Sequence, residues 1–232
     1  MFKVCLDPGH GQHDPGAVGP SGLKEKDVVL SVALKLGEKL KNSGIDVVYT
    51  RTNDNPGFPR DIRQNLAKRV DIANSSNADC FVSIHCNSAT SSEAHGTEIY
   101  VVKLGFNAEK LARAIQLEFI KATELRDRGI KTANFYVIKY TQMPAVLVEM
   151  AFISNPYEEK LLASVDFQDN VAVAMAKGIC NYFEAKYVTE KEHWAEKHYK
   201  SLKEKGVEIY EKRFDDYITR GELFALLDRI VK

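Results

Sequence analysis

The sequence lacks the features that direct a protein into or across a membrane. None of its 232 residues belongs to a hydrophobic run long enough for a transmembrane helix. The first ten residues, MFKVCLDPGH, lack the basic region and the long apolar stretch of a secretory signal peptide. We therefore expect a protein that is made in the cytoplasm without a signal peptide and that has no membrane partner.

An excess of charge of either sign is also missing. The chain carries 32 Lys and Arg side chains against 32 Asp and Glu side chains, and its formal net charge is +0 at pH 7. A chain with this balance has no strong overall field to attract nucleic acid or anionic lipid. We expect no nucleic-acid partner.

Cysteine is scarce and its spacing is irregular. The four cysteines are Cys5, Cys80, Cys86 and Cys180, and no two of them form a CxxC pair. This spacing suggests neither a zinc ribbon nor a disulfide framework. Reduced thiols are the expected state.

Strand-like and helix-like segments alternate along the first 187 residues. Short apolar runs predict strands, and apolar residues repeated every three to four positions predict amphipathic helices. The predicted strands cover residues 2–6, 45–50, 80–85, 97–102, 135–138 and 145–150, and the predicted helices cover 27–40, 61–74, 108–123, 157–163 and 169–187. This alternation predicts an α/β fold in which helices cover both faces of a twisted, mostly parallel sheet.

The composition changes after Tyr187, which divides the chain into residues 1–187 and 188–232. The second segment is dense in charge and in helix-forming residues. It predicts a small C-terminal helical hairpin: a helix over 193–205, a turn at Gly206, and a second helix whose N-cap Thr219 forms a capping box with Glu222. Two short helices bury little area, so we expect this piece to dock or to self-associate.

Two histidines and two glutamates stand at the ends of apolar runs or glycine-rich loops. They are His10 in VCLDPGHG, Glu25 in GLKEKD, His85 in FVSIHCNS and Glu149 in AVLVEMAF. Ligands of parallel sheets bind beyond the carboxyl ends of the strands, and three of the four residues lie at or just past such an end. Two histidines and a glutamate with an open position form a hydrolytic zinc site, and the fourth residue would remain a free carboxylate. If the four converge, the protein is a metallohydrolase.

Each of these residues also has a simpler interpretation. His10 could accept a hydrogen bond within its loop, and Glu25 could be an ordinary residue at a helix N-terminus. His85 needs a partner if it is buried, and Asn87, on the same strand face, could supply one. Glu149 is the most informative, because a carboxylate in a central strand is costly to bury unless it faces a charge or a metal.

Four segments that contain these residues resemble a known enzyme family. They are VCLDPGHGQHDPGAVGPSGLKEKD, FVSIHCNS, RGIKTANFYVI and PAVLVEMAFISNPYEE, and they occur in the expected order over roughly residues 1–185. Together they resemble the zinc-dependent N-acetylmuramoyl-L-alanine amidases (amidase type 3) of bacterial autolysins and phage endolysins. Two departures, Cys86 in place of a small alanine and His95 before a glycine, do not touch the ligand set.

The resemblance implies roles for individual residues. His10, Glu25 and His85 would bind Zn²⁺, and Glu149 would be the catalytic carboxylate. The substrate would be peptidoglycan, and the cleaved bond would be the amide between N-acetylmuramic acid and L-alanine of the stem peptide. Asn87 and Asn134 are candidates for contact with the glycan or the peptide, although Asn134 also suits a turn before a strand.

The tail carries a second resemblance. HWAEKHYKSLKEKGV and ITRGELFALLDRIV resemble the start and the end of one S-layer homology repeat, with a shorter segment between them and Gly221 in place of alanine. Trp194 and Arg220 match positions that could contact a secondary cell-wall polymer. A single repeat suits either a weak wall anchor or a helical pair that forms a homo-oligomer, and self-association would combine both through avidity.

Three other functions are open at this point. A zinc peptidase could cut within the stem peptide, a cysteine hydrolase could use Cys86 with His85, and a non-catalytic wall-binding or S-layer protein could be built around the tail. Adjacent strand residues face opposite sides, which disfavours the Cys86–His85 pair.

The expected biological context is a phage endolysin that lyses a Gram-positive host after holin-type release. The alternative is an autolysin of a sporulating cell, with the same activity, released when the mother cell lyses.

Overall fold

The computed structural model describes residues 1–189 and 201–206. The chain forms two compact units, Met1–Thr189 and Glu190–Lys232. The helical hairpin expected in the tail, with Trp194 and Arg220, lies largely outside the described residues. Its predicted structure and its contacts therefore stay predictions.

The described residues contain a six-stranded sheet in the order β2-β1-β3-β6-β4-β5. The strands are β1 (Lys3–Pro8), β2 (Asp46–Tyr49), β3 (Cys80–Asn87), β4 (Thr97–Val101), β5 (Asp127–Thr132) and β6 (Ala145–Phe152). Neighbouring strands run parallel except β4 and β6, which pair antiparallel. The predicted mostly parallel α/β fold is confirmed.

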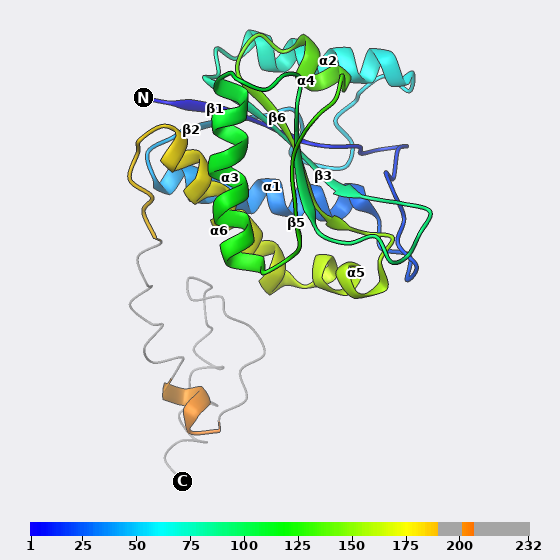
Figure 1. Ribbon diagram of the computed structural model, residues 1–232, viewed down its shortest axis with the longest axis vertical. Helices are drawn as coiled ribbons and strands as arrows, with labels where there is room; N and C mark the ends of the chain where they lie inside the picture. The colour runs from blue at the N-terminus through cyan, green and yellow to red at the C-terminus, as the bar shows by residue number, and fades with distance from the viewer. Residues whose placement is uncertain (190–200, 207–232) are drawn as a thin grey trace, which may run out of the picture. The chain divides into compact units, whose positions relative to one another are not determined.

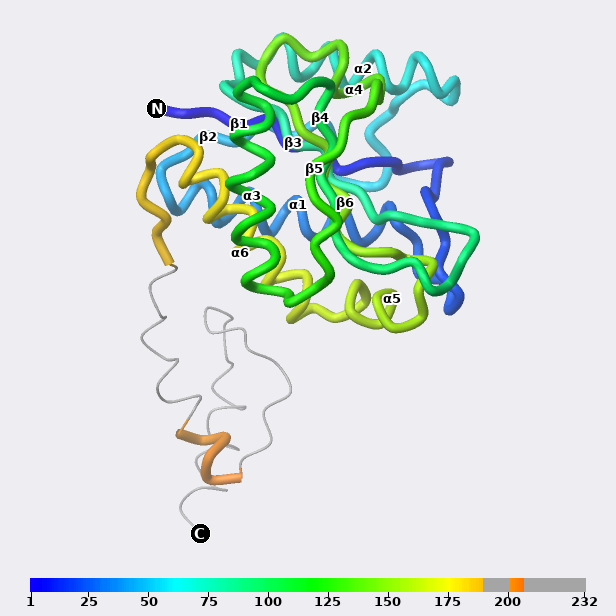
Figure 2. The backbone as a smooth tube through the Cα atoms, in the orientation of Figure 1, coloured from blue at the N-terminus to red at the C-terminus, as the bar shows by residue number. Residues whose placement is uncertain are grey.

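Helices cover both faces of the sheet (Figures 1 and 2). One face carries α1 (Glu25–Asn42), α3 (Asn107–Thr123) and α6 (Val165–Tyr182), and the other carries α2 (Ile62–Ser75) and α4 (Tyr136–Tyr140). The sheet separates two apolar cores, one on each face. Alternate residues of β3 contribute to them: Val82 and Ile84 belong to the larger core and Phe81 to the smaller one. Gly178 lets α6 approach α3 closely, since a Cβ there would lie 2.5 Å from the Cα of Ile115.

The predicted strand over residues 135–138 is wrong. That segment lies in and beside α4, where Val137 and Ile138 are buried against the sheet. A run as short as FYVI suits a buried helical turn as well as a strand, so its apolar character could not separate the two. The strand that precedes it is β5, whose sequence DRGIKT lacks the apolar run by which buried strands are recognised.

The topology brings the predicted site residues to one edge of the sheet. Because β1, β3 and β6 are parallel, their carboxyl ends meet at the same edge. The loop after β1 leads back to the N-terminus of α1 at that edge (Figure 1). No helix in the described ranges is long and apolar enough to span a bilayer.

Candidate metal centre

His10 lies in the loop that follows β1, two residues beyond the end of the strand. Its backbone is in the left-handed region, with φ +59°. Two buried arginines hold the loop from behind: Arg51 donates to the carbonyls of Pro8 and Gly9 at 2.9 and 2.8 Å, and Arg69 donates to the carbonyls of Pro8 and His10. The loop backbone is therefore fixed by charged donors that are satisfied within the fold.

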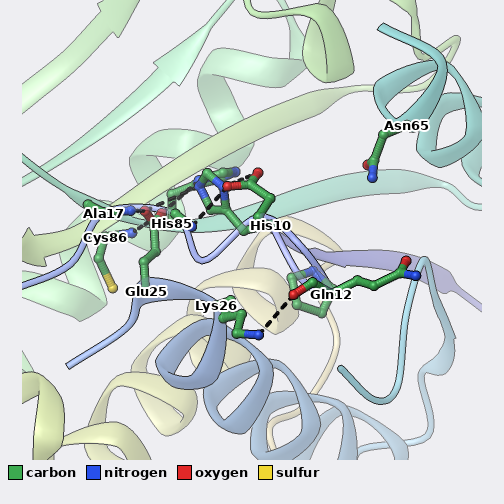
Figure 3. A network of polar contacts seen from close by, with 12 residues as sticks. His10, Gln12, Ala17, Glu25, Lys26, Asn65, His85 and Cys86 are labelled. Carbon is green, nitrogen blue, oxygen red and sulfur yellow. Dashed lines mark hydrogen bonds and ion pairs between the residues drawn. The ribbon is translucent and has the colours of Figure 1, made fainter. Parts of the chain in front are cut away.

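Side chains from three elements converge around Glu25, the first residue of α1 (Figure 3). Its Oε2 lies 3.2 Å from Nε2 of His10, and its Oε1 lies 2.9 Å from Nδ1 of His85. The backbone N–H groups of Ala17 and Cys86 also donate to the two oxygens, at 2.8 and 2.9 Å. The carboxylate is thus held rigidly between the two imidazoles.

One ligand atom from each of His10, Glu25 and His85 lies within 4.8 Å of the others, and this is the candidate metal group found in the described residues. Burial by itself would raise the pKa of Glu25, but the two histidines outweigh it and hold that pKa well below its ordinary value. Burial by itself would lower the pKa of His10, but Glu25 and Asp14 raise it to about 9.

Asp14 supports His10 from the outside of this group. Its Oδ2 lies 2.7 Å from Nδ1 of His10, which leaves Nε2 directed toward Glu25. A carboxylate behind a metal-binding imidazole fixes the ring and raises its basicity. Asp14 was not among the predicted site residues, although its spacing of four residues from His10 in a tight loop is a usable signal.

Glu149 lies beside the donor group on the neighbouring strand. It is the register partner of His85 across β3 and β6. Its Oε2 is buried and has no hydrogen-bond partner within the described residues. Burial raises its pKa to about 7, the charges of Glu25 and Glu98 add to this, and those of His85 and His10 oppose it. A buried, unpartnered carboxylate beside two histidines and a glutamate fits a site built for a cation.

The donor set therefore fits zinc. Two imidazoles and one carboxylate are the ligands that hydrolytic zinc sites use, with a position left open. A cavity of about 260 Å³ opens beside the group. His10, His85, Leu66, Val137 and Arg60 are among its lining residues. A substrate can reach the donor group through this cavity.

The match of the chain to a protein-family model agrees with this geometry. A family model described as N-acetylmuramoyl-L-alanine amidase matches residues 4–181. The chain belongs to the N-acetylmuramoyl-L-alanine amidase family. It is an amidase whose family acts on peptidoglycan, and the four convergent residues lie within the matched segment.

Individual relatives agree with this assignment. N-acetylmuramoyl-L-alanine amidase LytC of Bacillus subtilis is 41% identical over 182 residues, which are 78% of this chain but 35% of LytC. The germination-specific N-acetylmuramoyl-L-alanine amidase of the same organism is 36% identical over 191 residues, covering 79% of this chain and 80% of that protein. The solved catalytic domain of the amidase CwlV from Bacillus (Paenibacillus) polymyxa var. colistinus is 42% identical, with a TM-score of 0.73, 80% of this chain covered and 100% of that domain.

Helix α5 (Pro156–Ala163) fixes both sides of the amidase site, a role that was not predicted from the sequence. Glu158 accepts hydrogen bonds from the backbone N–H groups of Gly96 and Phe152 at 2.7 and 2.6 Å. Glu159 accepts from the backbone N–H and the hydroxyl of Ser21, both at 2.8 Å. The first clamps the strand end just after Glu149, and the second clamps the loop between His10 and Glu25. Both carboxylates look like ordinary surface residues in the sequence.

Asn87 does not partner His85, and that prediction is wrong. Its Nδ2 donates to Oε1 of Glu98 at 2.8 Å, whereas the ring of His85 contacts Glu25. The register shifts between these two residues: His85 pairs with Glu149, whereas Asn87 pairs with Phe152, three positions further along β6. Asn134 is exposed in the loop between β5 and α4. The substrate contacts predicted for both asparagines stay predictions.

Cys86 is buried in the larger core, on the face opposite His85. Burial raises the pKa of its thiol well above the ordinary value, and the charges of Glu25 and Glu149 add to the effect. A thiol of this kind is not a nucleophile at neutral pH. All four cysteines of the amidase are buried and free, as expected.

Gly16 leaves room for the ligands, and Gly22 in the same loop provides a matched control. A Cβ at Gly16 would lie 2.6 Å from Oε2 of Glu25 and 2.7 Å from Cδ2 of His10, whereas a Cβ at Gly22 would have nothing within 4 Å. Both residues have positive φ, +66° and +93°. Their substitution by alanine therefore strains the backbone in both cases but crowds the site in one.

We expect Gly16→Ala to lower zinc affinity and activity by at least about tenfold, as loss of a supporting contact does. Gly22→Ala should share the small loss of stability and retain the affinity. Competition for zinc with a coloured chelator measures the affinities, and thermal unfolding measures the shared strain. Equal zinc affinity in the two variants would show that Gly16 is not needed for room at the site.

Proposed function

We propose that His10, Glu25 and His85 hold one zinc ion, and that Glu149 is the general base and acid for hydrolysis of the amide between the lactyl group of N-acetylmuramic acid and L-alanine. The observation that carries the proposal is the buried, unpartnered Oε2 of Glu149 beside the three donor residues. The family supplies the substrate class, peptidoglycan.

Zinc bound there supplies a Lewis acid for the scissile carbonyl and lowers the pKa of water toward neutrality. Glu149 takes a proton from the attacking water as the new C–O bond forms. It then gives that proton to the nitrogen as the C–N bond breaks, so the carboxylate is regenerated. The raised pKa of Glu149 in the metal-free protein suits both roles, and a nearby cation lowers it by favouring the charged form.

The other residues keep this arrangement in place. Asp14 orients the imidazole of His10, and Arg51 and Arg69 fix the backbone that carries it. Pre-organised donors are effective because little reorganisation is then required as charge develops. Loss of the exposed Asp14 is expected to affect zinc affinity and turnover more than the stability of the fold, whereas loss of either buried arginine should also destabilise the fold.

A digest of purified Gram-positive cell walls tests the bond that is cut. The zinc-loaded enzyme should release fragments with new N-terminal L-alanine, and the Glu149→Gln variant at the same concentration should release none above background. New termini at other residues would instead identify a peptidase that acts within the stem. The two activities need the same metal site, so the products alone distinguish them.

For the biological setting, we propose a bacterial wall amidase of the sporulation cycle, released when the mother cell lyses. The support is the germination-specific relative, which matches along most of both chains. A phage endolysin released by a holin would use the same chemistry and is the alternative. In either setting the enzyme acts on the cell wall.

The tail is proposed to hold the enzyme on the wall through a secondary polymer or through self-association. Its support is the sequence resemblance to one S-layer homology repeat. The same wall suspension tests it: Trp194→Ala and Arg220→Ala in the full chain should leave more enzyme in the supernatant after sedimentation. Unchanged sedimentation and an unchanged mass in solution would leave the tail without either role.

A further inference from the structure

A line of polar side chains crosses the sheet from the metal site to its open edge. Glu149 on β6 pairs with His85 on one side and with Glu98 on the other. Side chains in register on neighbouring strands face the same way, so the three lie in one row on the face that carries α2 and α4. The row continues to β5, from which Arg128 and Lys131 reach Glu98.

Two cations share the single carboxylate at the end of this row. Glu98 is 2% exposed and accepts from Nε of Arg128 at 2.6 Å and from Nζ of Lys131. Tyr100 and Asn87 donate to its other oxygen at 2.7 and 2.8 Å. Every oxygen of Glu98 is therefore satisfied by fixed donors, and within this group positive charge exceeds negative. Glu158 also lies near Arg128, but backbone N–H groups hold both of its oxygens.

The two cations are accessible and rigidly placed. The side chain of Arg128 is 25% exposed and that of Lys131 is 38% exposed. The Arg128 guanidinium lies 4.8 Å from the ring centroid of Phe152, and Nζ of Lys131 lies 6.0 Å from that of Tyr100. Such contacts with aromatic faces restrain cations without neutralising them.

An aromatic surface flanks the Lys131 side of the cation pair. Phe135 packs edge-on against Tyr100 with 5.1 Å between the ring centroids, and Phe135 itself is 40% exposed. An apolar wall next to cations suits a ligand that combines a carboxylate with a peptide backbone.

The proposed function fixes which part of the substrate lies here. Glu149 has to deliver a proton to the departing nitrogen, so that nitrogen lies against Glu149 and the stem peptide continues beyond it. The cavity beside His10 and His85, at the other end of the row, is left for the sugar side. Strands are spaced about 4.8 Å apart, so β5 lies roughly 10 Å from β6. An extended peptide covers that distance in about three residues, and in fewer when long side chains reach back.

We propose that Arg128 and Lys131 form a stem-peptide subsite of this amidase, and that they bind the free carboxylate of the second stem residue. This inference rests on the proposed function, because it uses the role of Glu149 to orient the substrate. In peptidoglycan the second residue is D-glutamate, or D-isoglutamine where that carboxylate is amidated. The pair therefore makes the enzyme select acidic stems over amidated stems.

Binding to a protein that cannot turn over its substrate tests the subsite separately from catalysis. The zinc-loaded Glu149→Gln variant is titrated calorimetrically with N-acetylmuramoyl-L-alanyl-D-glutamate and with the D-isoglutamine analogue. Both ligands carry the γ-carboxyl as a methylamide, so that they differ in one carboxylate alone. The acid is expected to bind about tenfold more tightly, as a hydrogen bond between charged groups gives. In that background Lys131→Gln should remove most of the preference, Lys131→Arg should keep it, and Arg128→Gln should reduce it.

Arg113→Gln is the matched control, because Arg113 is an exposed cation paired with Glu109 on α3, on the opposite layer. It should retain the full preference. Equal affinity for the two ligands, no measurable binding of either, or a preference unchanged by both Lys131→Gln and Arg128→Gln would overturn the proposal. If instead the preference is present but Glu149→Gln still cleaves cell walls, the subsite stands and the proposed role of Glu149 fails.

Discussion

The Glu149→Gln variant is expected to bind zinc normally and to lose about 10²- to 10⁴-fold in turnover, the usual contribution of a general acid–base group. Glutamine preserves the volume of the side chain but cannot accept and return the proton. Glu149 is not among the three grouped donors, so the metal content should not change. Metal analysis of the purified variant and initial rates on cell walls measure the two quantities. Substantial activity in zinc-loaded Glu149→Gln would refute the assigned role.

The thermal stability of Glu149→Gln and of the wild type, measured against pH, tests whether the variant is folded and whether the wild-type carboxyl is buried. In the metal-free protein the pKa of Glu149 is raised from 4.5 to about 7, with burial as the largest cause. Between those values the folded state binds more protons than the unfolded chain, so this group lowers stability as pH rises. Glutamine removes the effect. The Tm of Glu149→Gln relative to wild type should therefore increase between pH 4 and pH 8, whereas a constant difference would contradict the burial.

The His10→Ala variant is expected to lose both zinc and activity. Lewis-acid stabilisation is worth several kcal/mol, so the loss of activity should reach at least about 10³-fold. His13→Ala is a close control, because His13 is an exposed histidine in the same loop, 3.2 Å from Nε of Arg60 and outside the donor group. It should keep zinc and activity.

Intermediate behaviour is expected for Asp14→Asn. The amide keeps a contact with the imidazole of His10 but loses the charge, so zinc affinity should fall by about 10- to 100-fold. Zinc affinity measured by chelator competition across the three variants should rank His13→Ala above Asp14→Asn above His10→Ala. If His13→Ala and His10→Ala lost zinc equally, the result would contradict the assignment of His10 as a zinc ligand and would indicate a general effect of the loop.

The sequence predicts the central strands and the four convergent residues because both leave a local signal. Buried parallel strands are continuous apolar runs, and a polar residue at the end of such a run is conspicuous, as His85 and Glu149 show. Glu149 is also conspicuous because burial of a carboxylate needs a reason. Parallel strand order then brings such residues to one edge.

The supporting residues leave no comparable signal. Arg51 and Arg69 are buried beneath the His10 loop, but a charged residue is predicted to be exposed when the sequence alone is considered. Glu158 and Glu159 have the spacing of a solvent-facing helix start. Their role as hydrogen-bond acceptors depends on backbone N–H groups of Gly96 and Ser21, which are distant in the sequence. β5 was missed for a related reason, since an edge strand with few apolar residues is defined by its partner β4.

A zinc titration of chelator-treated enzyme, followed by initial rates of wall hydrolysis and scored as new N-terminal L-alanine, tests the central claim most directly. The structure predicts no activity in the metal-free protein, and full recovery at one equivalent of zinc. His10→Ala should fail to recover at that ratio, and Glu149→Gln should take up the equivalent without recovering. Hydrolysis that persists in metal-free wild-type protein, or that needs no Glu149, would contradict the account.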